Sequence, residues 1–379
     1  MTEEKAASPA PEAATKAQSP PPAADSSPAP EPAQPEPVHI QADDEEPDET
    51  DVDSSWGEDA VSSTASISSS ILDYRKENGR TYHAYRDGKY LIPNDEQENE
   101  RLDFQHHLWY LTLDGRLGFA PPAHPEAKFA GRVLDVGTGT GIWAIDFGDE
   151  HPDAHVIGVD LSPIQPSFTP PNVHFQIDDL EDEWTFSQPF DYIHVRAMSG
   201  SIKNWSVFLE RCIEYEPTQN LSQLLLTCEN RNLKPGGWLE VQEPGRPIAD
   251  DDTFPPDCAL AKATALFAEG LAAAGSPLLD VFTLKDLFNG AGFVSYDEKR
   301  AYWPSNPWPK DKKLKEIAMW SNTNLSAGVE GFLMAVATRF LGWSLPEVTV
   351  LSAQARADLN DKRIHAYWPV ISAFAQKPE

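Results

Sequence analysis

The strongest constraint on the fold is an apolar segment that runs directly into a glycine-rich turn. Residues 133–143 have the sequence VLDVGTGTGIW, in which Gly137, Gly139 and Gly141 occupy alternate positions. The apolar start predicts a buried strand, and the pattern after the turn predicts a helix. Glycine allows positive φ and close backbone approach, and a helix start offers unpaired N–H groups. The segment therefore predicts a strand–turn–helix unit with a ligand at the turn, although the three glycines also fit a simple tight turn.

Strand and helix patterns alternate along the middle of the chain. The strand candidates are residues 132–136, 155–160, 173–177, 192–195 and 238–241. This alternation predicts an α/β fold with a doubly wound, mostly parallel sheet that is covered by helices on both faces.

The C-terminal part has more helix patterns. They cover residues 256–274, 283–289, 314–341 and 348–363. Two last strand candidates, residues 293–302 and 365–373, are expected to pair antiparallel at the edge of the sheet.

The N-terminal part differs from the rest in composition. Residues 1–72 are rich in Pro, Ser and acidic side chains and poor in aromatic and branched ones, which predicts a disordered tail. Its Ser-Pro pairs leave a docking or phosphorylation role open. Residues 73–129 are expected to form a helical lead-in, with a helix from Asn94 to Leu111 that Asn94 caps. Residues 130–379 then form the α/β domain, with helical insertions at about 250–290 and 311–363.

Composition excludes several classes of function. With 30 basic and 60 acidic residues the formal net charge is −30, which argues against direct binding of nucleic acid. The cysteines, Cys212, Cys228 and Cys258, form no closely spaced pair, so neither a metal site nor a disulfide framework is expected. We find no signal peptide and no membrane-spanning run, and we predict a nuclear or cytoplasmic protein with no membrane contact.

The residues around the glycine turn favour one cofactor over another. A dinucleotide-binding turn would have glycine at the position of Ile142, whereas here Gly141 comes one residue earlier. The carboxylate of Asp135 would be repelled by a pyrophosphate but attracted by an ammonium group. S-adenosylmethionine carries an ammonium group for Asp135 and a carboxylate for the backbone of the turn, including Thr138. The pattern therefore predicts S-adenosylmethionine, with NAD and an oxidoreductase as the alternative.

Two later strands end in acidic residues that would complete the cofactor site. Asp160 is expected to accept hydrogen bonds from the ribose hydroxyls, with Leu161 beside it. NAD sites use the same arrangement, so Asp160 alone does not choose the cofactor. Asp179 is the predicted contact of the adenine amino group, with Asp178 as the alternative, and Leu180 is expected to pack on the ring.

The catalytic residues are not fixed by any motif. Arg196 ends the fourth strand and is predicted to contact the cofactor carboxylate or a substrate, with a structural salt bridge as the alternative. His106, His107 and Glu243 are the candidates for a general base. One of the two adjacent histidines is expected to be a buried structural residue.

Five segments together resemble the class I methyltransferases, motif by motif and in the same order. They are residues 133–141, 155–162, 173–180, 190–196 and 233–240. The resemblance implies a Rossmann-like, seven-stranded sheet with a reversed hairpin at its edge. It also implies methyl transfer from S-adenosylmethionine.

A narrower resemblance extends over about residues 75–379. Its segments are residues 90–96, 101–107, 179–184, 196–202, 238–243 and 365–369. These are similar to the fungal LaeA-like methyltransferases. That family implies a role in secondary metabolism, either by methylating a small molecule of a pathway or a protein, or as a nuclear regulator with a velvet-type protein partner.

Two readings of this resemblance stay open beside the oxidoreductase. The first is an active methyltransferase whose acceptor is a small molecule or a protein. The second is a regulatory subunit that binds the cofactor and acts mainly through a protein complex. No run such as Asn-Pro-Pro-Tyr and no pair of glutamates after the fourth strand identifies the acceptor.

Overall fold

The computed structural model describes residues 71–213 and 232–379. The predicted disordered tail, with its Ser-Pro pairs, lies outside the described residues except for its C-terminal end. Cys228 also lies outside them.

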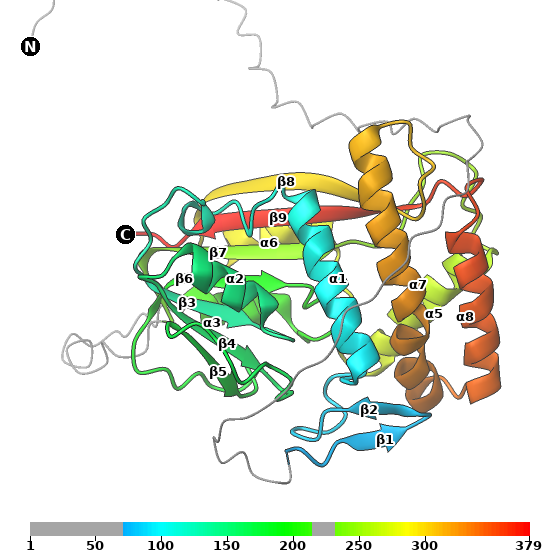
Figure 1. The fold of residues 1–379 in the computed structure, drawn as a ribbon, viewed down its shortest axis with the longest axis horizontal. Helices are drawn as coiled ribbons and strands as arrows, with labels where there is room; N and C mark the ends of the chain where they lie inside the picture. Colours follow the sequence, from blue (N-terminus) through cyan, green and yellow to red (C-terminus); the bar gives the residue numbers. More distant parts are fainter. Residues whose placement is uncertain (1–70, 214–231) are drawn as a thin grey trace, which may run out of the picture. The chain divides into compact units, whose positions relative to one another are not determined.

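A seven-stranded sheet forms the centre of the described chain (Figure 1). Its strands follow the order β5-β4-β3-β6-β7-β9-β8. Their bounds are β3 Arg132–Val136, β4 His155–Asp160, β5 Val173–Ile177, β6 Phe190–Arg196, β7 Leu233–Pro244, β8 Val294–Pro304 and β9 Tyr367–Gln376. The first five run parallel, and β9 pairs antiparallel with both β7 and β8. The predicted doubly wound sheet with an antiparallel strand pair at its edge is thereby confirmed, and β9 is the strand that runs against the others.

The order of the strands determines where a ligand can bind. The chain moves from β3 outward through β4 to β5 and then returns to β6 on the other side of β3. Loops that follow β3 and β6 therefore leave in opposite directions and open a crevice at the carboxyl ends of these strands. The register places Asp135 of β3 beside His194 of β6 at this end.

Alternation of side chains along β3 builds a core on each face of the sheet. Val133 packs with Trp143 and Phe147 of α2 (Ile142–Glu150). Leu134 points to the other face, where it belongs to a cluster with buried residues of α3 (Trp205–Ile213) and α6 (Leu284–Gly290). Each fully buried side chain of this size stabilises the fold by roughly 1.5–3 kcal/mol.

Four helices form a separate layer beside the sheet. They are α1 (Glu96–Thr112), α5 (Ala259–Ala273), α7 (Lys312–Phe340) and α8 (Leu345–Leu359). Figure 1 shows α1, α7 and α8 side by side, and α5 packs against α7 and α8. The predicted helices 256–274, 314–341 and 348–363 correspond to α5, α7 and α8. Short 3₁₀ helices, η1 (Pro121–Ala123) and η2 (Val281–Thr283), lie in connecting segments.

The lead-in differs from its predicted form in two respects. It contains a hairpin of β1 (Arg75–Glu77) and β2 (Arg80–Tyr82) before the helix. The predicted cap Asn94 is wrong, because the Asp95 carboxylate accepts the hydrogen bond from the Glu98 amide at 3.2 Å. Asn94 instead accepts a hydrogen bond from the Thr81 hydroxyl at 3.0 Å and so attaches the helix start to the hairpin.

In the part of the chain that the structure describes, no helix is both long and apolar enough to cross a bilayer.

Candidate active site

The glycine turn has positive φ angles, which residues with a Cβ atom rarely adopt. Gly137, Gly139 and Gly141 have φ angles of 66°, 57° and 82°. A Cβ atom at Gly137 would collide with the Met198 side chain, and one at Gly141 would collide with the Phe175 ring. At Gly139 the nearest atom to such a Cβ is Cδ1 of Leu102, at 3.6 Å. The turn therefore needs glycine for its conformation at all three positions and for space at two of them.

A cavity lies at this turn, and nearly all predicted cofactor contacts line it. We call it the turn cavity. Its lining includes the predicted residues Asp135, Gly137, Thr138, Gly139, Asp160, Leu161, Asp179, Leu180 and Arg196. Gly141 does not line it, since it lies behind the turn against Phe175. The predicted contacts other than Gly141 therefore gather at the switch point, whereas the sequence did not identify other lining residues, among them Lys89, Tyr90 and Met198.

Asp135 is buried, and both of its carboxylate oxygens bond within the protein. Oδ1 lies 2.7 Å from Nδ1 of His194, and the Thr138 hydroxyl donates to Oδ2 at 2.5 Å. The His194 ring stacks on Trp143 with a centroid distance of 3.6 Å and an interplanar angle of 5°. Asp135 thus connects β3, β6 and the glycine turn, a role that the charge argument alone did not identify.

Asp160 joins the end of β4 to the same turn. Its Oδ2 accepts from the Gly139 amide and its Oδ1 from the Ser162 amide, each at 2.9 Å. The Gln165 side chain donates to the Gly139 carbonyl at 2.6 Å from the other side. Burial raises the pKa of Asp160, and the amide hydrogen bonds act in the opposite direction. The carboxylate therefore fixes the position of Gly139 within the cavity wall.

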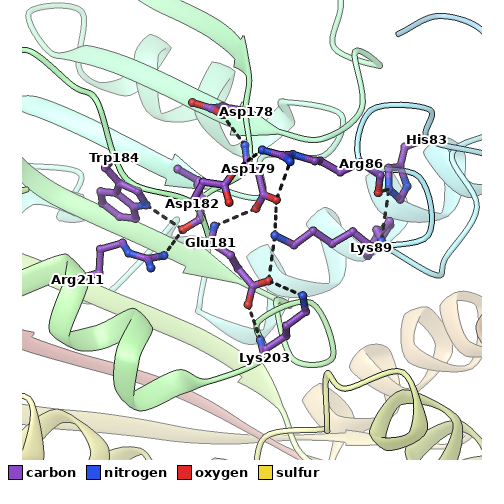
Figure 2. A network of polar contacts seen from close by, with 12 residues as sticks. His83, Arg86, Lys89, Asp178, Asp179, Glu181, Asp182, Trp184, Lys203 and Arg211 are labelled. Carbon is purple, nitrogen blue, oxygen red and sulfur yellow. Dashed lines mark hydrogen bonds and ion pairs between the residues drawn. The ribbon is translucent and has the colours of Figure 1, made fainter. Parts of the chain in front are cut away.

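The acidic loop after β5 is held by cations from the lead-in, as Figure 2 shows. Lys89 bonds to Asp179 and lies 3.0 Å from a Glu181 oxygen, while Arg86 bonds to Asp182. The side chain of Asp179 is only 4% exposed, so this ion pair is largely removed from water. Lys89 and the acidic loop line the turn cavity together and form one of its walls.

Asp178 and Asp179 consequently differ in their surroundings. Asp179 has an ion-pair partner in Lys89 and also accepts from the Glu181 amide at 3.0 Å. Asp178 accepts from the Asp179 amide at 2.8 Å and lines the same cavity. Among the described residues, Asp179 pairs with a cation, whereas Asp178, the alternative adenine contact, does not.

Arg196 is positioned by a chain of polar contacts. Its Nη2 donates to Nδ1 of His106 at 3.1 Å, and Nε2 of His106 lies 2.8 Å from a carboxylate oxygen of Asp146. Since an arginine nitrogen can only donate, Nδ1 of His106 accepts and Nε2 carries the proton. Burial lowers the pKa of His106, which agrees with a neutral ring, although Asp146 opposes that shift. Burial also lowers the pKa of Arg196 to about 10.

Neither histidine candidate lines a cavity at the site. His106 has both ring nitrogens engaged and positions Arg196. His107 packs on Trp320 of α7, with ring centroids 4.2 Å apart. The two adjacent residues point to different sides of α1, as expected, but neither is placed to act on a ligand.

A second cavity of about 490 Å³ adjoins the first. We call it the helix cavity, because residues of α1, α5 and α7 line it together with the end of β7. Tyr90, Leu102, Gln105 and Ala197 line both cavities, so these residues form the boundary between them. Aromatic side chains contribute much of its wall; they are Phe254, Phe267, Trp303, Phe332 and Trp368.

Glu243, the third catalytic candidate, lines the helix cavity and is fully buried. The amides of Met198 and Ser199 donate to its Oε1 at 2.5 and 3.2 Å. Burial raises the pKa of this carboxyl to about 8. Of the three candidates, only Glu243 faces a space where a substrate can bind.

The chain is similar in sequence to several known proteins. Residues 104–297 match the family model described as a methyltransferase domain. The chain is 39% identical over 322 residues to methyltransferase pytC of Aspergillus terreus, covering 84% of this chain and 93% of that protein. It is 36% identical over 309 residues to the secondary metabolism regulator LAE1 of Cochliobolus heterostrophus, covering 80% and 94%.

A third relative has a more specific name. The protein-methionine methyltransferase laeA of Emericella nidulans is 34% identical over 333 residues, covering 85% of this chain and 81% of that protein. Among solved structures, phosphoethanolamine N-methyltransferase 2 of Haemonchus contortus with S-adenosyl-L-methionine has a TM-score of 0.40 and 18% identity. That match covers 77% of this chain and 55% of that one.

Proposed function

Since this chain belongs to the LaeA-like family of fungal methyltransferases that use S-adenosylmethionine, we propose that it methylates a small, largely apolar molecule bound in the helix cavity. Its relatives are tied to fungal secondary metabolism, and one is named methyltransferase pytC. The turn cavity would hold the cofactor, and the adjoining helix cavity would hold the acceptor.

The residues of the turn cavity fit S-adenosylmethionine. The guanidinium of Arg196 and the amides at the start of α2 suit the cofactor's carboxylate. Asp160 suits the ribose hydroxyls, and Asp178 suits the adenine amino group, with Leu161 and Leu180 as apolar neighbours of the rings. When bound, the cofactor supplies a methyl group already activated on a positively charged sulfur. The protein's own task is then to orient the acceptor and exclude water.

The observation that carries the proposal is the shared boundary of the two cavities. A space of about 490 Å³ lies within the range of small-molecule sites and meets the turn cavity at Tyr90 and Ala197. Its walls are mainly apolar, so an acceptor gains binding free energy by burying rings or alkyl groups there. A single side chain of a protein substrate would fill only part of that space.

The names of several relatives support a second candidate. They are secondary metabolism regulators, and one is a protein-methionine methyltransferase. On this alternative the chain binds the cofactor in the nucleus and acts on, or together with, a protein partner of the velvet type. The predicted absence of nucleic-acid contact follows from the net charge of −30 and applies to both candidates.

Transfer of a labelled methyl group tests whether the acceptor is a small molecule or a protein. The purified full chain would be incubated with S-adenosylmethionine carrying a deuterated methyl group and with a fungal small-molecule extract. A second reaction would contain the protein fraction of the same extract. We expect the label in a small molecule, detected by mass spectrometry. Label confined to protein, including this chain itself, would overturn the proposed acceptor and favour the regulatory alternative.

A further inference from the structure

The helix cavity is apolar but has one polar oxygen without a partner. Among the residues described, Oε2 of Glu243 is buried and makes no hydrogen bond. Buried carboxyl oxygens normally have partners, because leaving one unpaired costs free energy. A purely structural role would need only Oε1, which accepts from the amides of Met198 and Ser199. Because Glu243 lines the helix cavity, this second oxygen is a candidate partner for a ligand there.

The position of Glu243 is also that expected for an acceptor-binding group. Its carboxyl bonds to the segment Ala197–Ser199, which separates the two cavities. Ala197 lines both cavities, Met198 lines the turn cavity and Ser199 lines the helix cavity. A polar atom bound to Oε2 thus lies at the boundary where methyl transfer has to occur.

The other charged groups of the helix cavity do not compete for this role. Arg101 donates to Glu98 and to Asn324, the latter at 2.6 Å, and its guanidinium lies 4.9 Å from the centre of the Phe332 ring. Arg246 is exposed. Glu243 itself has no ion pair among the described residues, and most of the residues that line the cavity with it are apolar or aromatic.

Building on the proposed function, we propose that Glu243 binds the acceptor through Oε2, and that the acceptor is an apolar, ring-containing molecule with a hydroxyl group. When the carboxyl is ionised, the hydroxyl donates to Oε2 at the boundary of the cavities, and the rings fill the space between the aromatic side chains. A flat hydrophobic alcohol or phenol has this chemistry. A long, multiply charged acceptor does not, because most of the wall is apolar or aromatic and could not solvate several charges.

Two matched probes test this binding mode without knowledge of the natural acceptor. They are 2-naphthalenemethanol, which has a hydroxyl donor, and its methyl ether, which lacks the donor. Binding to the full-length protein saturated with S-adenosylhomocysteine would be measured by calorimetry. We expect the alcohol to bind about tenfold more tightly than the ether, as a hydrogen bond to a charged group implies, at a pH above the raised pKa of Glu243.

The variant Glu243→Gln separates this binding mode from simple hydrophobic affinity. Glutamine keeps the oxygen for the Met198 and Ser199 amides but presents an N–H group to the cavity. We expect the preference for the alcohol to disappear, while binding of the ether changes less than about threefold. Thr264→Val is the control: Thr264 lines the same cavity, but its hydroxyl donates to the Leu260 and Ala261 carbonyls. It should keep the preference of the wild type.

The outcomes distinguish the two proposals. An equal preference in wild type and Glu243→Gln, with S-adenosylhomocysteine bound to both, would overturn the role of Glu243 and leave the proposed function standing. Failure of both probes to bind the wild type would overturn the apolar acceptor class and favour a protein acceptor. Failure of S-adenosylhomocysteine to bind would refute the cofactor site itself. Should Glu243→Gln not fold, an absent alcohol preference in the wild type alone would still overturn the proposal.

Discussion

At the scale of single residues, the site depends on backbone conformations and buried carboxyls more than on exposed side chains. A Cβ added at Gly139 would lie 3.6 Å from Cδ1 of Leu102, a residue that lines the turn cavity. The φ of Gly139, 57°, lies in the left-handed region. Asp160 and Glu243 accept hydrogen bonds from backbone amides around the two cavities, and Asp135 bonds to the side chains of Thr138 and His194.

Substitution of Gly139 by alanine should weaken cofactor binding. The left-handed backbone becomes strained by about 1–2 kcal/mol, and the turn relaxes away from the geometry that presents its amides. We expect affinity for S-adenosylhomocysteine to fall by about tenfold or more. Gly290→Ala is the matched control, because a Cβ there meets nothing within 4 Å and φ is not positive. Unchanged affinity in Gly139→Ala, measured by calorimetry, would contradict the assignment of the turn.

Glu243 should make stability depend on pH. Burial raises the pKa of the folded carboxyl from 4.5 to about 8, so the native state holds a proton that the unfolded chain has released. The stabilisation is therefore complete below pH 4.5 and is lost as pH rises through about 8. Each pKa unit by which the folded carboxyl differs from the unfolded one changes the free energy of unfolding by about 1.4 kcal/mol.

The melting temperature of wild type relative to Glu243→Gln should accordingly fall over that range of pH. The variant removes the titrating group and keeps the backbone contacts. A difference between the two proteins that stays constant with pH would show that Glu243 is ionised at neutral pH in the folded state.

At the scale of elements, the lead-in provides one wall of the turn cavity. The hairpin precedes Arg86 and Lys89, whose cations hold the acidic loop after β5 (Figure 2). Arg80 donates to Asp95, the cap of α1, at 2.5 and 2.7 Å and so fixes the hairpin to the helix. This wall was not predicted, since no local pattern pairs Lys89 with Asp179 far along the chain.

The sequence does contain a motif that indicates the hairpin. Asn78-Gly79 is a dipeptide typical of tight hairpin turns, and both residues have positive φ. The two strands are only three residues long and carry charged side chains, so their periodicity is too short to indicate a strand. Asn94 and Asp95 are both good caps, and only the contact of Asn94 with Thr81 decides between them.

Removal of the Lys89 cation should loosen this wall. Lys89→Gln leaves the buried Asp179 carboxylate without its main partner, at a cost of about 1–3 kcal/mol in the free energy of unfolding. We expect S-adenosylhomocysteine to dissociate several-fold faster, as measured by stopped-flow tryptophan fluorescence. Arg75→Gln is the control, since its ion pairs with Glu77 and Asp87 are more exposed. Equal dissociation rates in both variants would show that the ion pairs of Lys89 do not close the cavity.

At the scale of the whole chain, the sequence predicted the sheet well because the central strands β3, β4 and β6 are local apolar runs that end in a turn signal. The bounds of β3, β4 and β5 agree with the predicted ones. The carboxyl ends of parallel strands meet at one edge, which is why the residues that follow them gather in the turn cavity. The helix cavity required tertiary packing of α1, α5 and α7, and no spacing in the sequence predicts that packing.

The candidate site also has a part that was predicted from the sequence and a part that was not. Residues of the turn were recognised by type and order, whereas the partners that engage them come from distant segments. His194 meets Asp135 only through the β3–β6 register, and His106 meets Arg196 only because α1 packs beside α2. Glu243 stood out among the three catalytic candidates only once the helix cavity was seen beside it.

S-adenosylmethionine is expected to bind in the turn cavity, next to the helix cavity that would hold the acceptor. Calorimetric titration of the full-length protein with S-adenosylmethionine, S-adenosylhomocysteine and NAD tests it most directly. We predict saturable binding of the first two with one site per chain and no binding of NAD, with affinity lost in Gly139→Ala. Binding of NAD in their place, or affinity that is independent of Gly139, would contradict the claim.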